Sequence, residues 1–240
     1  MRLVSSRIVA ALAALTLIAA TPRSYAGVEA LLLVGSHTDA AGTQNGVGGG
    51  PLLELHAQLD RVAVHLEGIP VISIPGVKPS VAYGQATPAL GIFNGQVEVL
   101  ADRPGFLSVG LGETIYNQRT PLPAIGQTVA SRLAGVRYTL RYVRPTRNNH
   151  VIEAFVGAAP VLTGADHYTF LDGSPETVKP EQASEIDAQL SLGYVRGSSE
   201  WLFGVRTLNF AARFTATGEG ADRNVGFGPL IEWRHLFGSP

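Results

Sequence analysis

Apolar and polar residues alternate along most of the chain after its first 26 residues. In the segment 131–142, one face carries Ala134, Val136, Tyr138, Leu140 and Tyr142, and the other carries Gly135, Arg137, Thr139 and Arg141. Segments 106–115 and 185–194 repeat this pattern. Because successive side chains of a β-strand point to opposite faces, a period of two predicts strands with one apolar and one polar face.

The same pattern predicts ten strands, at 27–36, 48–59, 62–74, 88–101, 105–116, 131–144, 150–163, 184–196, 199–214 and 225–237. Connections after odd-numbered strands are long, and those after even-numbered strands are tight turns such as Asp60-Arg61 and Gly197-Ser198. A membrane barrel sorts its connections in this way, with short turns at the periplasmic end and long loops outside. We therefore predict an all-β fold, a single antiparallel up-and-down transmembrane β-barrel of about ten strands.

The last predicted strand, 225–237, places Phe227, Ile231, Trp233 and Phe237 on one face. With this strand, the segment 27–237 resembles the small outer-membrane β-barrel proteins of Gram-negative bacteria. The resemblance implies a place in the cell outer membrane, contact with outer-membrane lipid, and recognition of strand 225–237 by the barrel assembly machinery. A soluble periplasmic lipid-binding β-barrel is the alternative, but a narrow barrel of that kind needs an apolar interior.

The N-terminal residues 1–26 have the features of a cleavable signal peptide. A short basic start precedes the apolar segment 8–20, and the small residues Ser24 and Ala26 occupy the −3 and −1 positions of a cleavage site. We expect cleavage after Ala26, which leaves 27–240 as one barrel domain.

Composition excludes several classes of function. The 240 residues include no Cys, 28 Gly and only 15% charged residues, and the net charge is −1. A chain without Cys holds no disulfide, zinc-thiolate centre, iron–sulfur cluster or cysteine nucleophile. The near-neutral charge argues against nucleic acid as a partner. The sequence predicts no cofactor.

The tight turns predict which residues face one another. Around 145–149, pairing Arg144 with His150 places Arg141 opposite Glu153 as an interior ion pair.

Around Gly197-Ser198, pairing Arg196 with Ser199 places Gln189 beside Arg206 on the interior face. Apolar residues of this strand then change face at Leu208, so we expect a β-bulge near Arg206 and Thr207.

Together these faces predict a charged interior, whose network contains Arg137, Arg141, Glu153, Asp187, Gln189, Arg206, Glu232 and Arg234, with Glu98 and Arg213 also facing inward. Barrels of eight to ten strands have little more room than their own side chains need. We expect ion pairs that fill and stiffen the barrel. The alternative is a narrow polar channel.

One interior cluster is a candidate metal site. If the hairpin turns at Asp60-Arg61, His56 pairs with His65 and Glu54 pairs with Glu67. Two facing carboxylates repel unless a proton, a cation or a protonated imidazole lies between them. Imidazole and carboxylate ligands suit zinc or a similar divalent ion. The alternative is a structural hydrogen-bonded network.

The outer rim carries His37 and Asp39 near one strand and Asp166 and His167 near another. The omptin family of outer-membrane proteases, which also has ten strands, places Asp and His at this rim. Neither the His-Ser arrangement of outer-membrane lipid A deacylases nor a Gly-x-Ser-x-Gly elbow is present. We therefore predict a non-catalytic outer-membrane barrel for envelope structure, surface binding or adhesion. A narrow pore and an outer-membrane hydrolase remain alternatives.

Overall fold

A computed structural model describes residues 24–39, 42–73, 89–101, 106–122, 127–169, 172–214 and 220–237. The strands are β1 (Ser24–Asp39), β2 (Gly42–Leu59), β3 (Val62–Ser73), β4 (Ala89–Leu100), β5 (Leu107–Leu122), β6 (Gln127–Pro145), β7 (His150–Ala159), β8 (Thr163–Thr169), β9 (Pro175–Val178), β10 (Gln182–Arg196), β11 (Ser199–Phe214) and β12 (Gly220–Phe237). A short 3-10 helix, Arg147–Asn149, precedes β7. In these ranges no helix is long and apolar enough to cross a membrane.

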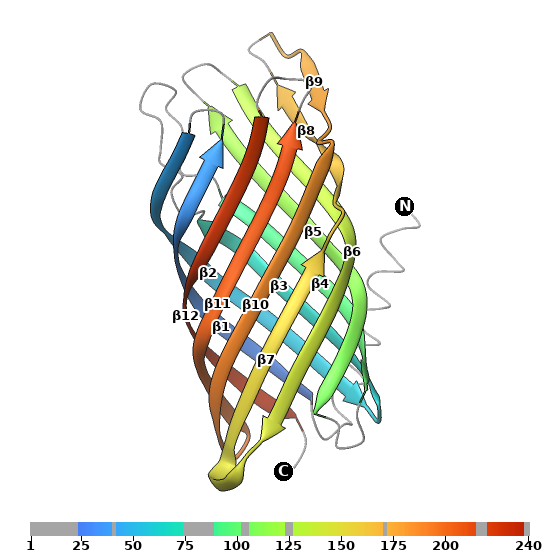
Figure 1. Cartoon of the computed structure of the whole chain (residues 1–240), viewed down its shortest axis with the longest axis vertical. Helices are drawn as coiled ribbons and strands as arrows, with labels where there is room; N and C mark the ends of the chain where they lie inside the picture. Colours follow the sequence, from blue (N-terminus) through green and yellow to red (C-terminus); the bar gives the residue numbers. More distant parts are fainter. Residues whose placement is uncertain are drawn as a thin grey trace.

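The strands form a closed antiparallel barrel (Figure 1). Each strand pairs with its neighbours in up-and-down order, and β1 pairs with β12 to close the sheet. Strands β7 and β8 both pair with β6, at its lower and upper parts, so they form one barrel strand that is interrupted at 160–162. Strand β9 pairs with β8. The barrel therefore has ten strands, which confirms the predicted fold.

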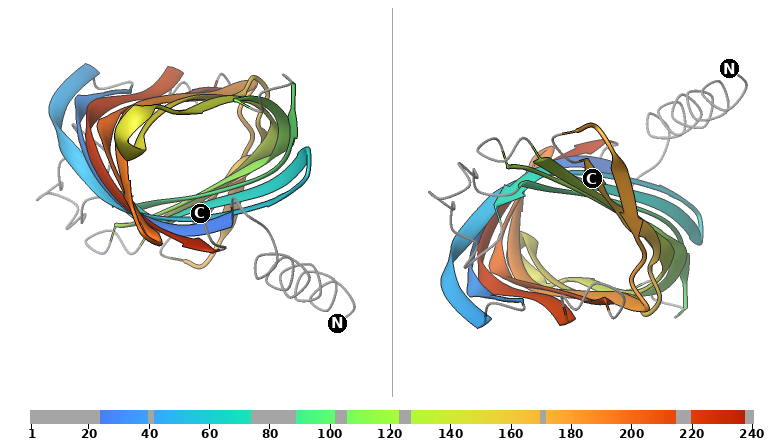
Figure 2. Two further views of the ribbon diagram at one scale, coloured as in Figure 1. Left: turned by 90° about the horizontal axis from the view of Figure 1, so that it is seen from below. Right: turned by 90° about the horizontal axis from the view of Figure 1, so that it is seen from above.

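The two ends of the barrel differ. We call the end with the turns at 60–61, 147–149 and 197–198 the turn end, which is the lower end in Figure 1, and the opposite end the outer end. The end views in Figure 2 show the ring of strands in cross-section.

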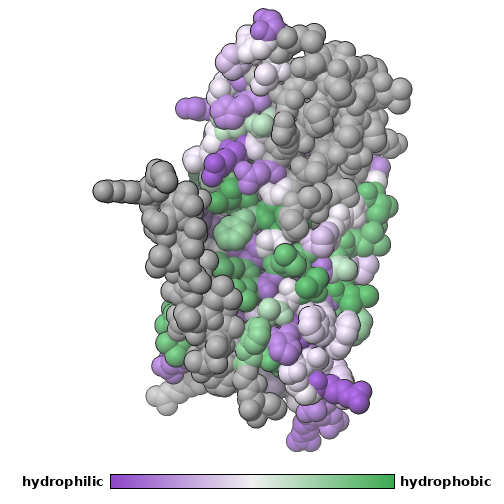
Figure 3. All heavy atoms as spheres, turned by 180° about the vertical axis from the view of Figure 1, so that it is seen from behind, coloured by the Kyte–Doolittle hydropathy of each residue, from purple (hydrophilic) through white to green (hydrophobic). Residues whose placement is uncertain are grey.

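The outer face of the barrel carries an apolar belt. Its exposed residues include Leu140, Leu190, Leu192, Phe203 and Ile231. Figure 3 shows hydrophobic side chains gathered at mid-height on one side, with hydrophilic ones toward both ends. An apolar exterior that alternates with a polar interior is the pattern of a membrane barrel, so the soluble alternative loses its support.

Several strands extend farther toward the outer end than their hydrophobic pattern predicts. Strand β2 starts at Gly42 rather than near 48, and β6 starts at Gln127 rather than near 131. The predicted loop 164–183 contains most of the β8–β9 hairpin. Main-chain pairing continues beyond the belt, where no lipid imposes alternation, so the sequence signal ends before the strand does.

The turn of the β8–β9 hairpin contains Asp172. The main-chain N–H and the hydroxyl of Ser174 donate to its carboxylate, at 2.8 and 2.5 Å. These hydrogen bonds lower the pKa of Asp172 from its usual value.

The register of the β6–β7 hairpin differs from the prediction by two residues. Arg141 pairs with Phe155, and Glu153 pairs with Val143. The reason is the turn: Asn148 and Asn149 adopt positive φ within the 3-10 helix, which lets β6 continue to Pro145. A shift of two residues keeps every side chain on its predicted face.

The predicted bulge in β11 is wrong. Arg206 pairs with Gln189 as predicted, but the pairing of β10 with β11 continues without a shift to Arg213. Leu208 therefore shares the inner face with Arg206. Arg213 shares the outer face with Phe203, so its predicted inward position is also wrong.

Leu208 faces inward because the interior itself becomes apolar toward the outer end. A cluster fills the barrel there, made of residues such as Leu31, Leu33, Leu52, Ile69, Ile92, Tyr116, Leu133 and Leu230, with Leu208 and Phe210 packed against it. The rings of Tyr116 on β5 and Phe210 on β11 meet at 4.9 Å between centroids. The barrel thus contains a charged layer and, beyond it, an apolar layer.

Candidate functional site: the charged interior

Four buried arginines lie at the centre of the charged layer. Arg141, on β6, donates to Glu153 on β7 at 2.5 Å and reaches Glu98 on β4 at 3.4 Å. It also lies 3.6 Å from Glu54 on β2. One guanidinium thus links strands from different sides of the barrel.

Arg234, on β12, extends this group. It lies 2.5 Å from Glu153 and 3.1 Å from Glu54, and it also pairs with Glu232. Its guanidinium lies 4.2 Å from the centre of the Tyr25 ring, a distance typical of a cation–π contact. Glu153 and Glu54 each contact both arginines, so Arg141 and Arg234 form one connected group.

A second group lies around Asp187 on β10. Arg206 lies 2.7 Å from Glu67 and 2.8 Å from Asp187, and Arg137 lies 2.5 Å from the other oxygen of Asp187. Arg137 also binds Glu185 at 2.9 Å. Asp187 therefore joins Arg206 to Arg137, and Arg206 joins β11 to β3.

Glycine makes room for these large side chains. A Cβ atom at Gly157 would lie 2.2 Å from a terminal nitrogen of Arg137 and 2.5 Å from Asp187. A side chain there would therefore disrupt the Arg137–Asp187 pair, which gives a physical reason for glycine at this inward position.

Acids outnumber arginines in this layer. Its four buried guanidiniums face nine buried carboxylates: Glu29, Glu54, Glu67, Glu98, Glu153, Glu185, Asp187, Glu200 and Glu232. Neutral side chains also donate hydrogen bonds to these carboxylates. Ser108 on β5 donates to Glu98 at 2.9 Å, and Asn94 donates to Glu67 at 2.9 Å.

The structure brings seven of the eight residues of the predicted network into these ion pairs. The exception is Gln189, which is buried beside Arg206 in the sheet but donates to Ser191 at 3.1 Å. The predicted network lacks Glu29, Glu185 and Glu200. Strict alternation from the predicted inward residues Asp187 and Arg206 places Glu185 and Glu200 inside. No inward residue was predicted in 27–36, so alternation had no reference position for Glu29.

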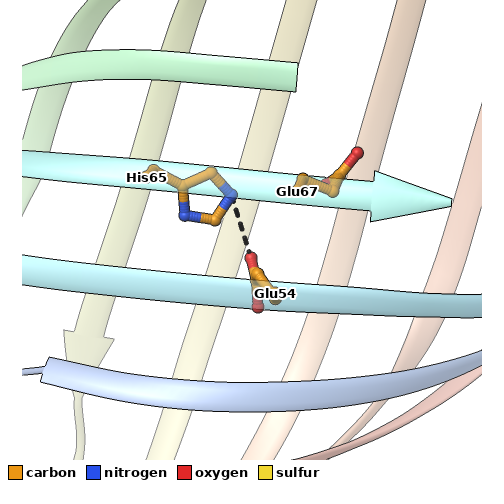
Figure 4. A group of neighbouring side chains, drawn as sticks. All are labelled: Glu54, His65 and Glu67. Atoms are coloured by element: carbon orange, nitrogen blue, oxygen red, sulfur yellow. Dashed lines mark ion pairs between the residues drawn. The ribbon is translucent and has the colours of Figure 1, made fainter. Parts of the chain in front are cut away.

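Of the four residues predicted as a metal site, three lie together and the fourth does not. Strands β2 and β3 pair His56 with His65 and Glu54 with Glu67, around Asp60 at positive φ. Ligand atoms of Glu54, His65 and Glu67 lie within 4.8 Å of one another (Figure 4). His56 is not part of this group, because its ring stacks on Tyr25 at 5.1 Å.

Arginines already occupy the positions around these three residues. His65 Nε2 lies 3.2 Å from Glu54 and 3.1 Å from a guanidinium nitrogen of Arg141. Glu67 is bound by Arg206. A divalent ion at this point would have to displace at least one guanidinium or lie beside it, and both are costly in a buried site.

We therefore expect the three residues to serve as part of the network rather than as metal ligands. Adding zinc to the metal-free protein should leave its thermal unfolding midpoint unchanged. A ligand that binds only the folded state would raise that midpoint. A midpoint that rises with zinc concentration, and stays unchanged with zinc in the His65→Gln variant, would contradict this expectation.

The predicted rim residues lie on separate strands. His37 on β1 contacts Asn224 on β12 at 2.7 Å, whereas His167 on β8 contacts Thr177 on β9 at 3.1 Å. Strands β10, β11 and β12 lie between β8 and β1 in the sheet. Asp166 is buried on β8, and the side chain of Asp39 lies outside the described residues.

The whole fold is similar to that of solved outer-membrane proteins. The outer membrane protease OmpT of Escherichia coli matches with a TM-score of 0.51 and 9% identity, over 90% of this chain and 98% of that one. The protein has the fold of the Gram-negative outer-membrane β-barrels. At 9% identity, the likeness to OmpT extends to the fold and not to its activity.

Further outer-membrane barrels match with lower TM-scores. Neisserial surface protein A gives 0.40 with 10% identity, over 89% of this chain and 97% of that one. The Pseudomonas putida toluene transporter TodX gives 0.35 with 10% identity, over 91% and 90%. No family model matches this outer-membrane barrel, and no curated protein matches it by sequence.

Proposed function

We propose that this protein is a non-conducting and non-catalytic outer-membrane barrel that serves the envelope as a stable scaffold with a binding surface at its outer end. One observation carries the proposal, namely that side chains cross the interior at two successive levels. At the charged level, Arg206 joins β11 to β3; at the apolar level, Tyr116 on β5 meets Phe210 on β11.

A narrow gap near the turn end, lined by described residues, supports the same proposal. A gap of about 40 Å³ lies beside His56, Glu98 and Arg141. This volume accommodates a water molecule rather than a passing solute. A pore for small solutes, the closest alternative, would need a continuous polar path through the apolar layer.

We expect the purified protein to show no steady conductance in planar lipid bilayers. The double variant Tyr116→Ala with Phe210→Ala removes the two rings that meet in the apolar layer. It tests whether the conductance measurement detects an opening in that layer. A stable channel of nanosiemens conductance in the unmodified protein would contradict the closed interior.

An outer-membrane hydrolase is the enzymatic alternative, and the rim residues give it little support. A hydrolytic Asp–His pair needs its two side chains within hydrogen-bond reach of each other and of a substrate. In the described part of the chain, His37 contacts Asn224 and His167 contacts Thr177, so the two rim histidines belong to separate strand pairs.

We further propose that the chain is exported with residues 1–26 as a signal peptide and inserted into the outer membrane by the barrel assembly machinery, which would recognise strand β12. Cleavage after Ala26 would start the mature chain at Gly27, within β1 and opposite Arg234. It would also remove Tyr25 from beneath the Arg234 guanidinium, so the cleavage position decides whether this contact exists in the mature protein.

A further inference from the structure

The barrel wall separates at the outer end, between β8 and β10. Pairing of β10 with the seventh barrel strand ends at Glu185 and Ala159. Beyond that point β8 pairs with β6 and β9. Among the described residues, the main-chain hydrogen bond from Leu162 N–H to the Ala183 carbonyl, at 2.7 Å, continues across the junction. A cavity of about 1010 Å³ lies at this separation.

The walls of the cavity combine apolar surface with positive charge. Apolar atoms come from Pro160, Val161, Leu162, Ala165, Ala183 and Ala211. The charged lining residues are Arg132, Lys179, Arg213, Arg223 and Glu181, with His167 beside them. Within the described part of the chain, none of the four cations pairs with a carboxylate, so their charge is open to a ligand.

Three of these cations lie on the membrane-facing side of the barrel. Arg213 shares its face of β11 with Phe203, and Arg223 shares its face of β12 with Phe227. Arg132 shares its face of β6 with Leu140. Each arginine lies on the outer-end side of the apolar residue of its own strand, where the lipid headgroups of a membrane barrel begin.

We propose that this cavity binds an anionic lipid of the surrounding outer leaflet, with its phosphate headgroup on the three arginines and an acyl chain along Val161 and Ala211. Arginine binds phosphate oxygens through two parallel hydrogen bonds, and basic pockets on membrane proteins bind phosphorylated headgroups. The volume suits a ligand of lipid size rather than a single ion. The inference does not depend on a closed interior, since the cavity lies at the wall.

The test uses phosphatidic acid, which joins a phosphate monoester to two acyl chains. The full barrel is held in a neutral detergent, and lipid binding is measured by native mass spectrometry and by the rise in the unfolding midpoint. The unmodified protein should bind phosphatidic acid, whereas diacylglycerol and inorganic phosphate should not raise the midpoint.

Two sets of variants separate the charges from the cavity. Each of Arg132→Gln, Arg213→Gln and Arg223→Gln should weaken binding about fivefold, as expected for one cation near a headgroup. Ala211→Trp fills the cavity with all charges kept and should abolish binding. The double variant Arg147→Gln with Arg196→Gln removes two arginines at the turn end and should bind normally.

Each other outcome overturns the proposal. If the three arginine variants bind phosphatidic acid as tightly as the unmodified protein does, these arginines do not form a headgroup site. Equal protection by inorganic phosphate would indicate a soluble anion as the ligand, and equal binding of diacylglycerol would indicate an apolar site that does not use the charges. Normal binding by Ala211→Trp would indicate attraction to surface charge without a cavity.

Discussion

Replacing Arg234 by glutamine should lower the free energy of unfolding by about 3–5 kcal/mol. The side chain is buried and lies within ion-pair distance of Glu153, Glu54, Glu232 and Glu200. Glutamine keeps most of the volume but removes the guanidinium that contacts all four carboxylates. Burying a charge without its partner costs far more than a lost surface contact. Urea unfolding of the reconstituted barrel measures the difference.

The matched control is Arg196→Gln, because Arg196 is exposed at the turn end of β10. Its cost should stay within about 0.5 kcal/mol. A second variant, Arg234→Gln with Glu232→Gln, should recover part of the loss, because the ion pair that Glu232 makes among the described residues is with Arg234. An Arg234→Gln protein as stable as the control would show that the network contributes little to stability.

Alternation was enough to predict most members of the charged layer. It assigns each residue to a face, and a register error of two residues leaves that assignment unchanged. Arg141 and Glu153 are therefore bonded at 2.5 Å although they are not directly opposite each other. Long side chains reach diagonal neighbours across a strand pair, so the ion pair did not depend on the exact turn.

The contacts across the barrel were not predictable in the same way. Arg206 on β11 meets Glu67 on β3, and Arg234 on β12 meets Glu153 on β7. Such pairs depend on the tilt and stagger of the strands around the closed barrel, which no single hairpin specifies. Local pairing therefore identified His56 with the metal quartet, whereas the closed barrel places it on Tyr25.

The apolar layer was not predictable from the polar face of the strands. If the interior is polar along the whole barrel, Leu208 and Phe210 can only face outward, and this predicts a bulge. The structure shows that the inner face itself changes from Arg206 to Leu208 without a change of register. An apolar residue at an inward position of a strand has two possible explanations. The strand can contain a bulge, or the barrel can contain a second, apolar interior layer.

Replacing Leu190 by arginine should destabilise the barrel by about 2–4 kcal/mol in lipid vesicles if the side chain lies near the bilayer midplane. Leu190 is on the outer face of β10, between Ala154 on β7 and Val205 on β11, and it is 55% exposed. On a soluble protein, arginine at so exposed a position would cost less than about 0.5 kcal/mol. The size of the loss therefore measures contact with lipid.

Leu190→Ala is the control, because it removes the apolar side chain without adding a charge. The same face of β10 already carries Arg196 at the turn end, so the face alone does not exclude arginine. Depth in the bilayer should decide the cost, because an arginine near the interface reaches water, whereas one at Leu190 must hold its charge within the apolar belt. Equal stability of Leu190→Arg and Leu190→Ala in vesicles would contradict the placement of this face against lipid.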